Sequence, residues 1–342
     1  MVTYTLKVVD IRKETEDTVT ICFKQPAIRK IKYQAGQYLS LIFRINSRRY
    51  VRPYSFSSCP FVDQFLEVTV KRVPNGIVSN HIHDTIDVGD SIEALVPMGD
   101  FIYEDKGDTR EVYFWGAGSG ITPLISLIKH ILTSTELKVV LAYGNRSFDT
   151  TIFSSTIESF KEKYAERFKV WHFHTQLQIA PENTDVIEGR INSDLILKIV
   201  ARADVNVIKH YICGPKGLKE SVTETLCKLG TSDDRIFTEE FEISKNPTDF
   251  VNVTTEYIKI NFKSVEYDLE VIKGKSILES ALDAGLELPY SCQTGTCNTC
   301  KARTINGVIK MVGLSKERSD LLENECLLCC SHPVSDNVYI AI

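Results

Sequence analysis

Six of the ten cysteines in this chain of 342 residues crowd together after residue 290. These six are Cys292, Cys297, Cys300, Cys326, Cys329 and Cys330. Closely spaced thiolates close disulfides, hold a zinc ion or hold an iron–sulfur cluster. Because most of the cysteines lie in one short region, the pattern indicates metal or redox chemistry rather than a disulfide framework.

A zinc site would use two C-x2-C pairs, Cys297 with Cys300 and Cys326 with Cys329. The twenty-five residues between these pairs exceed the separation in a usual zinc ribbon, and Cys292 would have no role. A cluster would instead use the C-x4-C-x2-C spacing of Cys292, Cys297 and Cys300, with one distant fourth ligand. We therefore favour a [2Fe–2S] cluster over zinc.

The stretch PYSCQTGTCNTCKA resembles the cluster loop of plant-type ferredoxins, and the resemblance covers roughly the last ninety residues. Gly295 would let the loop approach the cluster without hindrance from a side chain. In LLCCSHPVSD the family's fourth ligand matches Cys329, with the adjacent Cys330 as the alternative. The resemblance implies a β-grasp ferredoxin domain with four cluster ligands, which are Cys292, Cys297, Cys300 and Cys329.

A [2Fe–2S] centre accepts one electron at a time, whereas metabolic reductants deliver hydride, so a mediator such as flavin is expected. The segments RPYSFSS, from Arg52, and GIVSNHI, from Gly76, offer candidate groups for it. Arg52 could pair with phosphate, Tyr54 could stack on a flat heterocycle, and Ser55 and Ser79 offer hydroxyls. A charged turn with an ordinary packed tyrosine is the alternative explanation of RPYS.

Together with GDSIEALVPMGDF (89–101), these segments resemble the flavin domain of the ferredoxin–NADP reductase superfamily. The resemblance implies FAD, with Arg52 at its phosphates, Tyr54 against the isoalloxazine, Ser79 at the pyrophosphate and Ser55 near N5 as a catalytic residue. The full set of expected flavin-binding residues is Arg52, Pro53, Tyr54, Ser55, Val70, Lys71, Gly76, Val78 and Ser79.

The stretch WGAGSGITP is typical of a phosphate-binding turn between a strand and a helix. Gly116, Gly118 and Gly120 give GxGxG rather than the usual dinucleotide fingerprint, and glycines alone also occur in ordinary tight turns. Thr122 as N-cap and Pro123 as first helical residue would direct the amides of the first turn at an anion. The pattern GxGxGITP also resembles the reductase superfamily.

In that superfamily a CGP tripeptide lies beside the nicotinamide. The match implies that Cys213 is a second catalytic residue and that Gly214 and Pro215 bind cofactor at the same sheet edge. A buried, purely structural Cys213 is the alternative. The ending EEFE (239–242) matches the family's acid-x-Phe, which places Phe241 near the flavin.

The residues after the second strand of this domain bear on the choice of nucleotide. A 2′-hydroxyl usually meets an acidic side chain there, whereas a 2′-phosphate meets arginine. The strand ends in YGNRS, which offers Arg146 and Ser147, with Asp149 close by. We therefore expect NADPH to be preferred to NADH.

Three successive sequence patterns would position these groups. Residues 1–104 alternate apolar and polar in short runs, which predicts an antiparallel β-barrel that binds FAD. Residues 105–243 alternate strands with helices, which predicts an α/β domain with a parallel sheet that binds NAD(P). A polar linker, 244–254, precedes the ferredoxin domain, 255–342, which begins with a predicted hairpin and a helix over 277–286.

Two histidine pairs, His81 with His83 and His172 with His174, are predicted to lie on strands, where alternate side chains share one side. Each pair could be half of a metal site, but no third ligand is evident. Ordinary, partly exposed histidines are the favoured interpretation.

Composition excludes several other functions. A net charge of −5 provides no basic field for nucleic acid or an anionic membrane. No apolar run reaches the length of a membrane span, and MVTYTLKVVD lacks the apolar core of a signal peptide. We expect a cytoplasmic protein, in which thiols stay reduced.

The order of flavin, nucleotide and ferredoxin domains resembles the reductase components of multicomponent bacterial oxygenases, the phenylacetyl-CoA epoxidase type among them. The resemblance implies hydride transfer from NADPH to FAD and single-electron transfer through the cluster to an oxygenase component. Two other functions stay open. The same cofactors could serve a dehydratase, demethylase or desaturase, or the chain could be a redox sensor that acts without turnover.

Overall fold

The computed structural model describes residues 2–27, 30–60, 62–105, 107–176, 186–201, 203–314 and 316–342. The chain divides into two compact units. The first comprises residues 1–41 and 54–239, and the second comprises residues 42–53 and 240–342. Within the described ranges, no helix combines the length and the apolar character needed to cross a bilayer.

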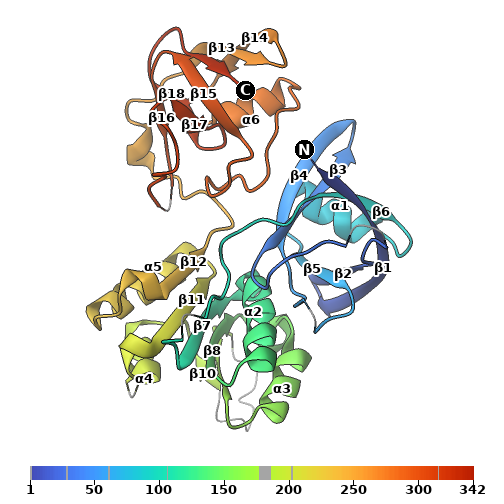
Figure 1. Ribbon diagram of the computed structural model, residues 1–342, viewed down its shortest axis with the longest axis vertical. Coiled ribbons are helices and arrows are strands. Elements are labelled where there is room, and N and C mark those ends of the chain that lie inside the picture. Colours follow the sequence, from blue (N-terminus) through green and yellow to red (C-terminus); the bar gives the residue numbers. More distant parts are fainter. Residues whose placement is uncertain are drawn as a thin grey trace. The chain divides into compact units, whose positions relative to one another are not determined.

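The N-terminal part of the chain forms a six-stranded sheet in the order β4-β3-β6-β1-β2-β5 (Figure 1). The strands are β1 (Thr3–Thr15), β2 (Thr18–Phe23), β3 (Tyr38–Ile45), β4 (Arg48–Ser55), β5 (Leu66–Lys71) and β6 (Ser91–Leu95). β1 pairs antiparallel with β2 and β6, and it buries alternate residues such as Leu6 and Val8. An antiparallel bridge from Phe56 to Val68 joins the chain after β4 to β5, the other edge strand, as expected of a barrel. Helix α1 (Ile77–Thr85) follows β5.

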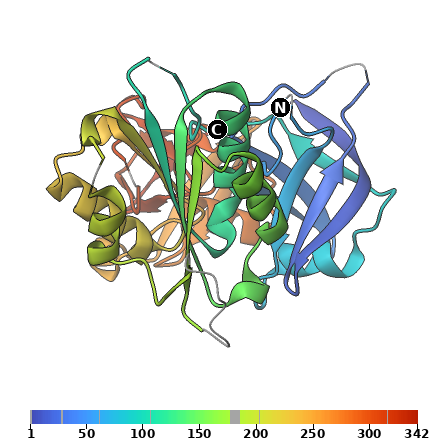
Figure 2. The same cartoon turned by 90° about the horizontal axis from the view of Figure 1, so that it is seen from below.

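The middle of the chain forms a parallel sheet in the order β10-β9-β8-β7-β11-β12. Its strands are β7 (Glu111–Ala117), β8 (Lys138–Asn145), β9 (Phe168–His174), β10 (Val186–Glu188), β11 (Ile208–Cys213) and β12 (Ile236–Glu239). Four helices cover it, namely α2 (Ile121–Ser134), α3 (Ser154–Lys163), α4 (Ser193–Val200) and α5 (Lys216–Lys228). Figure 2 shows α2 and α3 on one face of the sheet and α4 and α5 on the other. Because both faces are covered, a central strand such as β11 is buried along its whole length.

The C-terminal part forms a five-stranded sheet in the order β14-β13-β19-β15-β17, with a separate pair of β16 and β18. These strands are β13 (Glu256–Phe262), β14 (Val265–Val271), β15 (Lys301–Asn306), β16 (Ile309–Met311), β17 (Glu325–Leu327), β18 (Ser331–Pro333) and β19 (Tyr339–Ala341). β13 pairs antiparallel with β14 and parallel with β19. Helix α6 (Ile277–Asp283) begins with a capping box, in which Ser276 Oγ accepts from the Glu279 amide at 3.1 Å and Glu279 Oε2 accepts from the Ser276 amide at 2.7 Å.

The predicted fold class is confirmed, since an antiparallel sheet, a parallel α/β sheet and an α+β module follow one another. Strand β10 was not predicted. The strand predicted for His81 and His83 is wrong, because both lie on α1. His172 and His174 do share one side of β9, but both are buried rather than partly exposed.

Candidate functional site

The glycine turn and the CGP tripeptide meet at the centre of the parallel sheet. β7 and β11 are neighbours, and Cys213 at the end of β11 lies opposite Gly116. The strand order reverses between these two strands, which is where open parallel sheets bind nucleotides. Gly120 packs so closely on the end of β11 that a Cβ atom there would overlap the Cys213 carbonyl oxygen. The third glycine of the turn is therefore required by its packing against the end of β11.

The start of α2 differs from the sequence prediction. The helix begins at Ile121 with Gly120 as its N-cap, so Thr122 is not the N-cap and Pro123 is not the first helical residue. The Thr122 hydroxyl donates to the Ser119 carbonyl oxygen at 3.0 Å instead of accepting from an amide. Helical geometry starts earlier because a short 3₁₀ turn, Gly118–Gly120, leads directly into the helix.

Tyr143 supports this turn and was missed by the sequence analysis. Its ring is fully buried on β8, and its hydroxyl donates to the Gly118 carbonyl oxygen at 3.0 Å. Burial raises the pKa of Tyr143 well above its ordinary value, so the hydroxyl remains a donor at neutral pH. No local motif marks this tyrosine, because its role depends on the pairing of β8 with β7.

The residues proposed to select the nucleotide follow the next strand. Arg146 is exposed directly after β8, and its carbonyl oxygen accepts from the Gln176 amide at 2.7 Å. The Ser147 amide donates to Thr150 Oγ1 at 3.1 Å, at the start of the turn that contains Asp149. The turn after β8 therefore presents the guanidinium to solvent.

Gly214 and Pro215 connect β11 to α5. A Cβ atom at Gly214 would lie 3.2 Å from the Ala117 amide nitrogen, so this glycine packs against the end of β7. Pro215 is the N-cap residue of α5. Phe241, which follows β12, is 45% exposed, and its proximity to a flavin stays a prediction.

The expected flavin residues of the first unit lie on β4, β5 and the start of α1. RPYS forms the end of β4 rather than a turn. Ser55 and Val70 are buried, while Tyr54 and Lys71 are partly exposed, and Lys71 forms an ion pair with Asp17 at 3.1 Å. The roles of these residues at a flavin stay predictions.

The turn before α1 is tight. A Cβ atom at Gly76 would lie 2.6 Å from Ser79 Oγ, and that oxygen accepts from the Val73 amide at 3.1 Å. Val78 and Ser79 are buried in the first turn of the helix. Gly76 is therefore required by packing within the turn, and the Ser79 hydroxyl keeps its proton for donation.

Arg52 and Pro53 belong to the second unit. The Arg52 guanidinium donates to the Val51 carbonyl oxygen at 2.8 Å and lies 5.8 Å from the centre of the Tyr50 ring. Its role at flavin phosphates stays a prediction.

The four expected cluster ligands are in contact with one another. Hydrogen bonds from the thiols of Cys297 and Cys329 lower the pKa of Cys292, and one from Cys329 lowers the pKa of Cys300. Cys330 donates instead to the Leu327 carbonyl oxygen at 3.3 Å, although it also touches Cys329. These contacts support Cys329 as the fourth ligand.

The loop also supplies the backbone donors that a cluster needs. The amides of Thr294 and Cys297 each lie 3.4 Å from Cys292 Sγ. Gly295 has φ +77°, and a Cβ atom there would overlap the Leu314 side chain. Within the described residues no three His, Cys, Asp or Glu side chains are grouped as ligands of a single metal ion. The assignment of ligands therefore rests on the contacts among the thiols and on the motif, and this donor set fits a [2Fe–2S] cluster.

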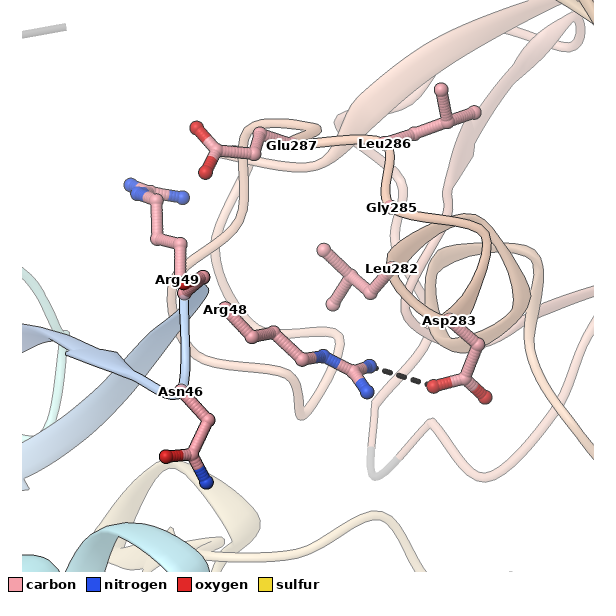
Figure 3. Close-up of a pocket in the computed structure, with 9 residues that line it drawn as sticks. Asn46, Arg48, Arg49, Leu282, Asp283, Gly285, Leu286 and Glu287 are labelled. Atoms are coloured by element: carbon pink, nitrogen blue, oxygen red, sulfur yellow. Dashed lines mark hydrogen bonds and ion pairs between the residues drawn. The ribbon is translucent and has the colours of Figure 1, made fainter.

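Residues 42–53 contact the segment before the cysteine loop within the second unit. Arg48 Nη2 lies 2.6 Å from Asp283 Oδ1, and Figure 3 shows this pair at the edge of a cavity of about 240 Å³. The Val51 amide donates to the Tyr290 hydroxyl at 3.0 Å, and Gln293 Nε2 donates to the Val51 carbonyl oxygen at 3.2 Å. Sequence reasoning missed these contacts, because they join segments more than two hundred residues apart.

Comparison with protein families identifies three domains. The chain matches an oxidoreductase FAD-binding domain over residues 5–103, an oxidoreductase NAD-binding domain over 114–224 and a 2Fe-2S iron-sulfur cluster binding domain over 260–334. The predicted cofactors, FAD, a nicotinamide nucleotide and a [2Fe–2S] cluster, are therefore confirmed.

Individual relatives match almost the whole length of this chain. The ferredoxin reductase component of 3-ketosteroid-9-alpha-monooxygenase from Rhodococcus rhodochrous is 31% identical, over 98% of this chain and 95% of the relative. A subunit of 1,2-phenylacetyl-CoA epoxidase from Escherichia coli (strain K12) is 29% identical, over 98% of this chain and 97% of the relative. Phthalate dioxygenase reductase has the same fold, with a TM-score of 0.69 and 21% identity over 99% of this chain and 98% of that structure. The chain therefore belongs to the ferredoxin–NADP reductase family of NAD(P)H-dependent oxidoreductases that carry a C-terminal [2Fe–2S] domain, a family that includes reductase components of oxygenases.

Proposed function

We propose that this oxidoreductase takes its electrons from NADPH and delivers them singly to an oxygenase component. The observation that carries the proposal is the full-length similarity to a monooxygenase reductase component, at 31% identity over 98% of the chain. FAD accepts hydride and releases single electrons, and the cluster transfers them one at a time. The protein's own task is to hold these groups and the nucleotide in place.

The residues of the first unit support the nucleotide part of this role. Gly120 lets the glycine turn pack directly on the end of β11, and Tyr143 fixes the turn through Gly118. The start of α2 then presents amide donors to an anion such as the nucleotide pyrophosphate. Arg146 is exposed after β8, where a guanidinium would meet a 2′-phosphate, so we assign the preference for NADPH to this residue.

The charge of the C-terminal module supports a partner with a basic surface. Residues 255–342 contain nine basic and twelve acidic side chains. An acceptor whose docking surface carries Lys or Arg would be attracted to it, with an association rate that falls as salt is added. The epoxidase subunit and the ketosteroid monooxygenase reductase component are 29% and 31% identical to this chain. An oxygenase of either kind is therefore a suitable first candidate for the electron acceptor. We place the protein in the cytoplasm, where the thiols of the cysteines outside the predicted cluster would stay reduced.

A single substitution tests the relay. Cys300→Ala removes one thiolate of the predicted cluster and leaves both nucleotide sites intact. We expect the variant to reduce a dye with NADPH as the wild type does, and to lose electron transfer to the oxygenase that co-purifies with the chain from its native host. Oxygenase turnover that survives this change contradicts the proposal. Absence of NADPH-dependent cytochrome c reduction by the wild type would favour a sensor instead.

A further inference from the structure

An arginine that no motif identifies lies against the cysteine loop. Arg318 stands in the segment between β16 and β17, and its guanidinium forms a two-point ion pair with Asp320. The distances are 2.7 Å from Nε to Oδ1 and 2.8 Å from Nη2 to Oδ2. This fork-to-fork geometry holds the guanidinium in one orientation.

The same guanidinium also bonds to the cysteine loop. Nη1 donates to the Gly295 carbonyl oxygen, and Nη2 donates to Asn298 Oδ1. Gly295 lies between the ligands Cys292 and Cys297, and Asn298 directly follows Cys297. One cation therefore contacts both stretches of the loop that connect the first three ligands.

The pair is oriented with its positive end inward. The Arg318 side chain is 12% exposed, whereas the Asp320 side chain is 50% exposed. The hydrogen bonds that Arg318 donates to Asp320, together with electrostatic attraction from Asp320 and from the nearby Cys297 and Cys292, raise the pKa of Arg318. The guanidinium is thus a permanent charge beside the ligands, and it is shielded from solvent more than its partner is.

The surrounding segment keeps this cation in place. The Val312 amide donates to the Cys330 carbonyl oxygen at 2.8 Å, and Leu314 packs over Gly295. Val312 and Leu314 therefore hold this side of the segment against Cys330 and Gly295. Because the charge is held by packing as well as by hydrogen bonds, it does not need to reorganise when the charge of the loop changes.

We propose that Arg318 raises the reduction potential of the cluster and that Asp320 partly offsets this effect. The proposal rests on the proposed function, because it concerns the cluster of that relay. Reduction adds one electron to the cluster, breaks no bond and requires no proton from the chain. The added negative charge is stabilised by the inward guanidinium and destabilised, more weakly, by the outer carboxylate. Arg318 acts through the cysteine loop and is a positioning and electrostatic residue, not a ligand.

A purely structural brace would behave differently from a charged pair. If Arg318 only held the loop, loss of either partner would loosen it, and the two losses would have similar consequences. If the charges of Arg318 and Asp320 set the reduction potential of the cluster, loss of one charge shifts this potential in the opposite direction from loss of the other. The sign of the shift therefore separates the two roles.

The experiment is a potentiometric titration of the purified holoprotein with dithionite, in which the EPR signal of the reduced cluster is measured. For Arg318→Gln we expect an approximately tenfold shift toward the oxidised cluster, about 59 mV more negative for one electron. Asp320→Asn should move the potential to a more positive value. Arg318→Lys should retain most of the wild-type potential, and Lys259→Gln, an exposed change on β13, should retain all of it.

Equal potentials in all variants, or shifts of the same sign in Arg318→Gln and Asp320→Asn, would overturn the proposal. The iron content of each variant shows whether the cluster is retained. Should Arg318→Gln lose its iron, the sign of the Asp320→Asn shift still decides. The titration uses neither nicotinamide nor an acceptor protein, so its result is independent of whether the chain serves an oxygenase.

Discussion

The ammonium group of Lys129 lies 2.9 Å from Asp63 Oδ2 and 3.1 Å from the Ser57 carbonyl oxygen. Lys129 is on α2, the helix that begins at the glycine turn, whereas Asp63 and Ser57 precede β5 of the N-terminal sheet. On the preceding turn of α2, Ser126 Oγ donates to the Ser58 carbonyl oxygen at 2.6 Å. These bonds tie the nucleotide part of the first unit to its flavin part, so they fix how the two predicted sites face each other.

Substitution of this lysine should destabilise the first unit. The Lys129 side chain is 10% exposed, and Glu67, 3.9 Å away, is 7% exposed. Lys129→Met would leave the carboxylates of Asp63 and Glu67 with less positive charge beside them. We expect this to lower the free energy of unfolding by roughly 3–5 kcal/mol. Both tryptophans, Trp115 and Trp171, lie in the first unit, so urea unfolding followed by tryptophan fluorescence reports on it.

Lys13→Met is the matched control. Lys13 forms an exposed pair with Glu16 at 3.8 Å, and its loss should change the free energy of unfolding by less than about 0.5 kcal/mol. If the two variants unfold at the same urea concentration, the buried joint does not hold the two parts together.

Replacement of Gly120 should be poorly tolerated. A methyl group there meets the backbone of Cys213 and Gly214, neither of which can rotate away. We expect Gly120→Ala to lower the free energy of unfolding by about 1–3 kcal/mol. We also expect it to weaken NADP⁺ binding, as measured by calorimetry. Gly217→Ala on α5 is the control, because the added Cβ would meet no atom of another part of the chain within 4 Å. This change should leave the stability unaltered or raise it by up to about 1 kcal/mol. Unchanged NADP⁺ affinity in Gly120→Ala would show that the turn does not shape the site.

Arg146 should distinguish the two nicotinamide nucleotides. With Arg146→Ala we expect the KM for NADPH in dye reduction to rise about tenfold, because a charge-assisted contact to a 2′-phosphate is lost. The KM for NADH should change little. Lys138→Ala removes the same charge from the other end of β8 and should affect neither nucleotide. Equal effects of Arg146→Ala on both nucleotides would remove the assignment of the phosphate contact.

The sequence predicted the fold class well because each part has a strong local pattern. The period of two in β1, the buried run of β11 and the spacing of the cysteines are all properties of neighbouring residues. The same reasoning failed for His81 and His83, because a nine-residue run with only three apolar side chains carries a weak periodic signal, and the helix there follows the turn at Gly76.

The contacts around the candidate sites were harder to predict. Tyr143 and Arg318 are brought to their loops by strand pairing and by a covering segment, and neither belongs to a recognisable motif. Thr122 has the type of an N-cap residue, but the preceding 3₁₀ turn moves the start of the helix. Motifs thus located the loops, whereas long-range packing determines which side chains support them.

Adjacent cysteines allow a direct test of the fourth ligand. Cys329 contacts Cys292 and Cys300, whereas Cys330 donates to Leu327. We expect Cys329→Ala to lose the visible absorbance and iron of the cluster, and Cys330→Ala to retain both. Loss of the cluster in Cys330→Ala, with retention in Cys329→Ala, would identify Cys330 as the fourth ligand.

His210 should make the stability of the first unit depend on pH. Trp115 Nε1 donates to His210 Nδ1 at 3.2 Å, and the histidine is fully buried on β11. Burial lowers the pKa of His210 to about 3. The folded state therefore holds the neutral ring, with Nδ1 as an acceptor.

This depressed pKa predicts a specific loss of stability in acid. The unfolded chain protonates His210 near its ordinary pKa of about 6.5, whereas the folded chain does not until about pH 3. The stabilisation is complete above pH 6.5 and decreases as the pH falls toward 3, by up to about 1.4 kcal/mol per pH unit. His210→Gln keeps an acceptor for Trp115 but cannot titrate, so its unfolding free energy should fall less steeply between pH 6 and pH 4. Urea unfolding at several pH values measures both slopes, and the other buried histidines contribute equally to each. Identical slopes would mean that His210 does not control this part of the acid response.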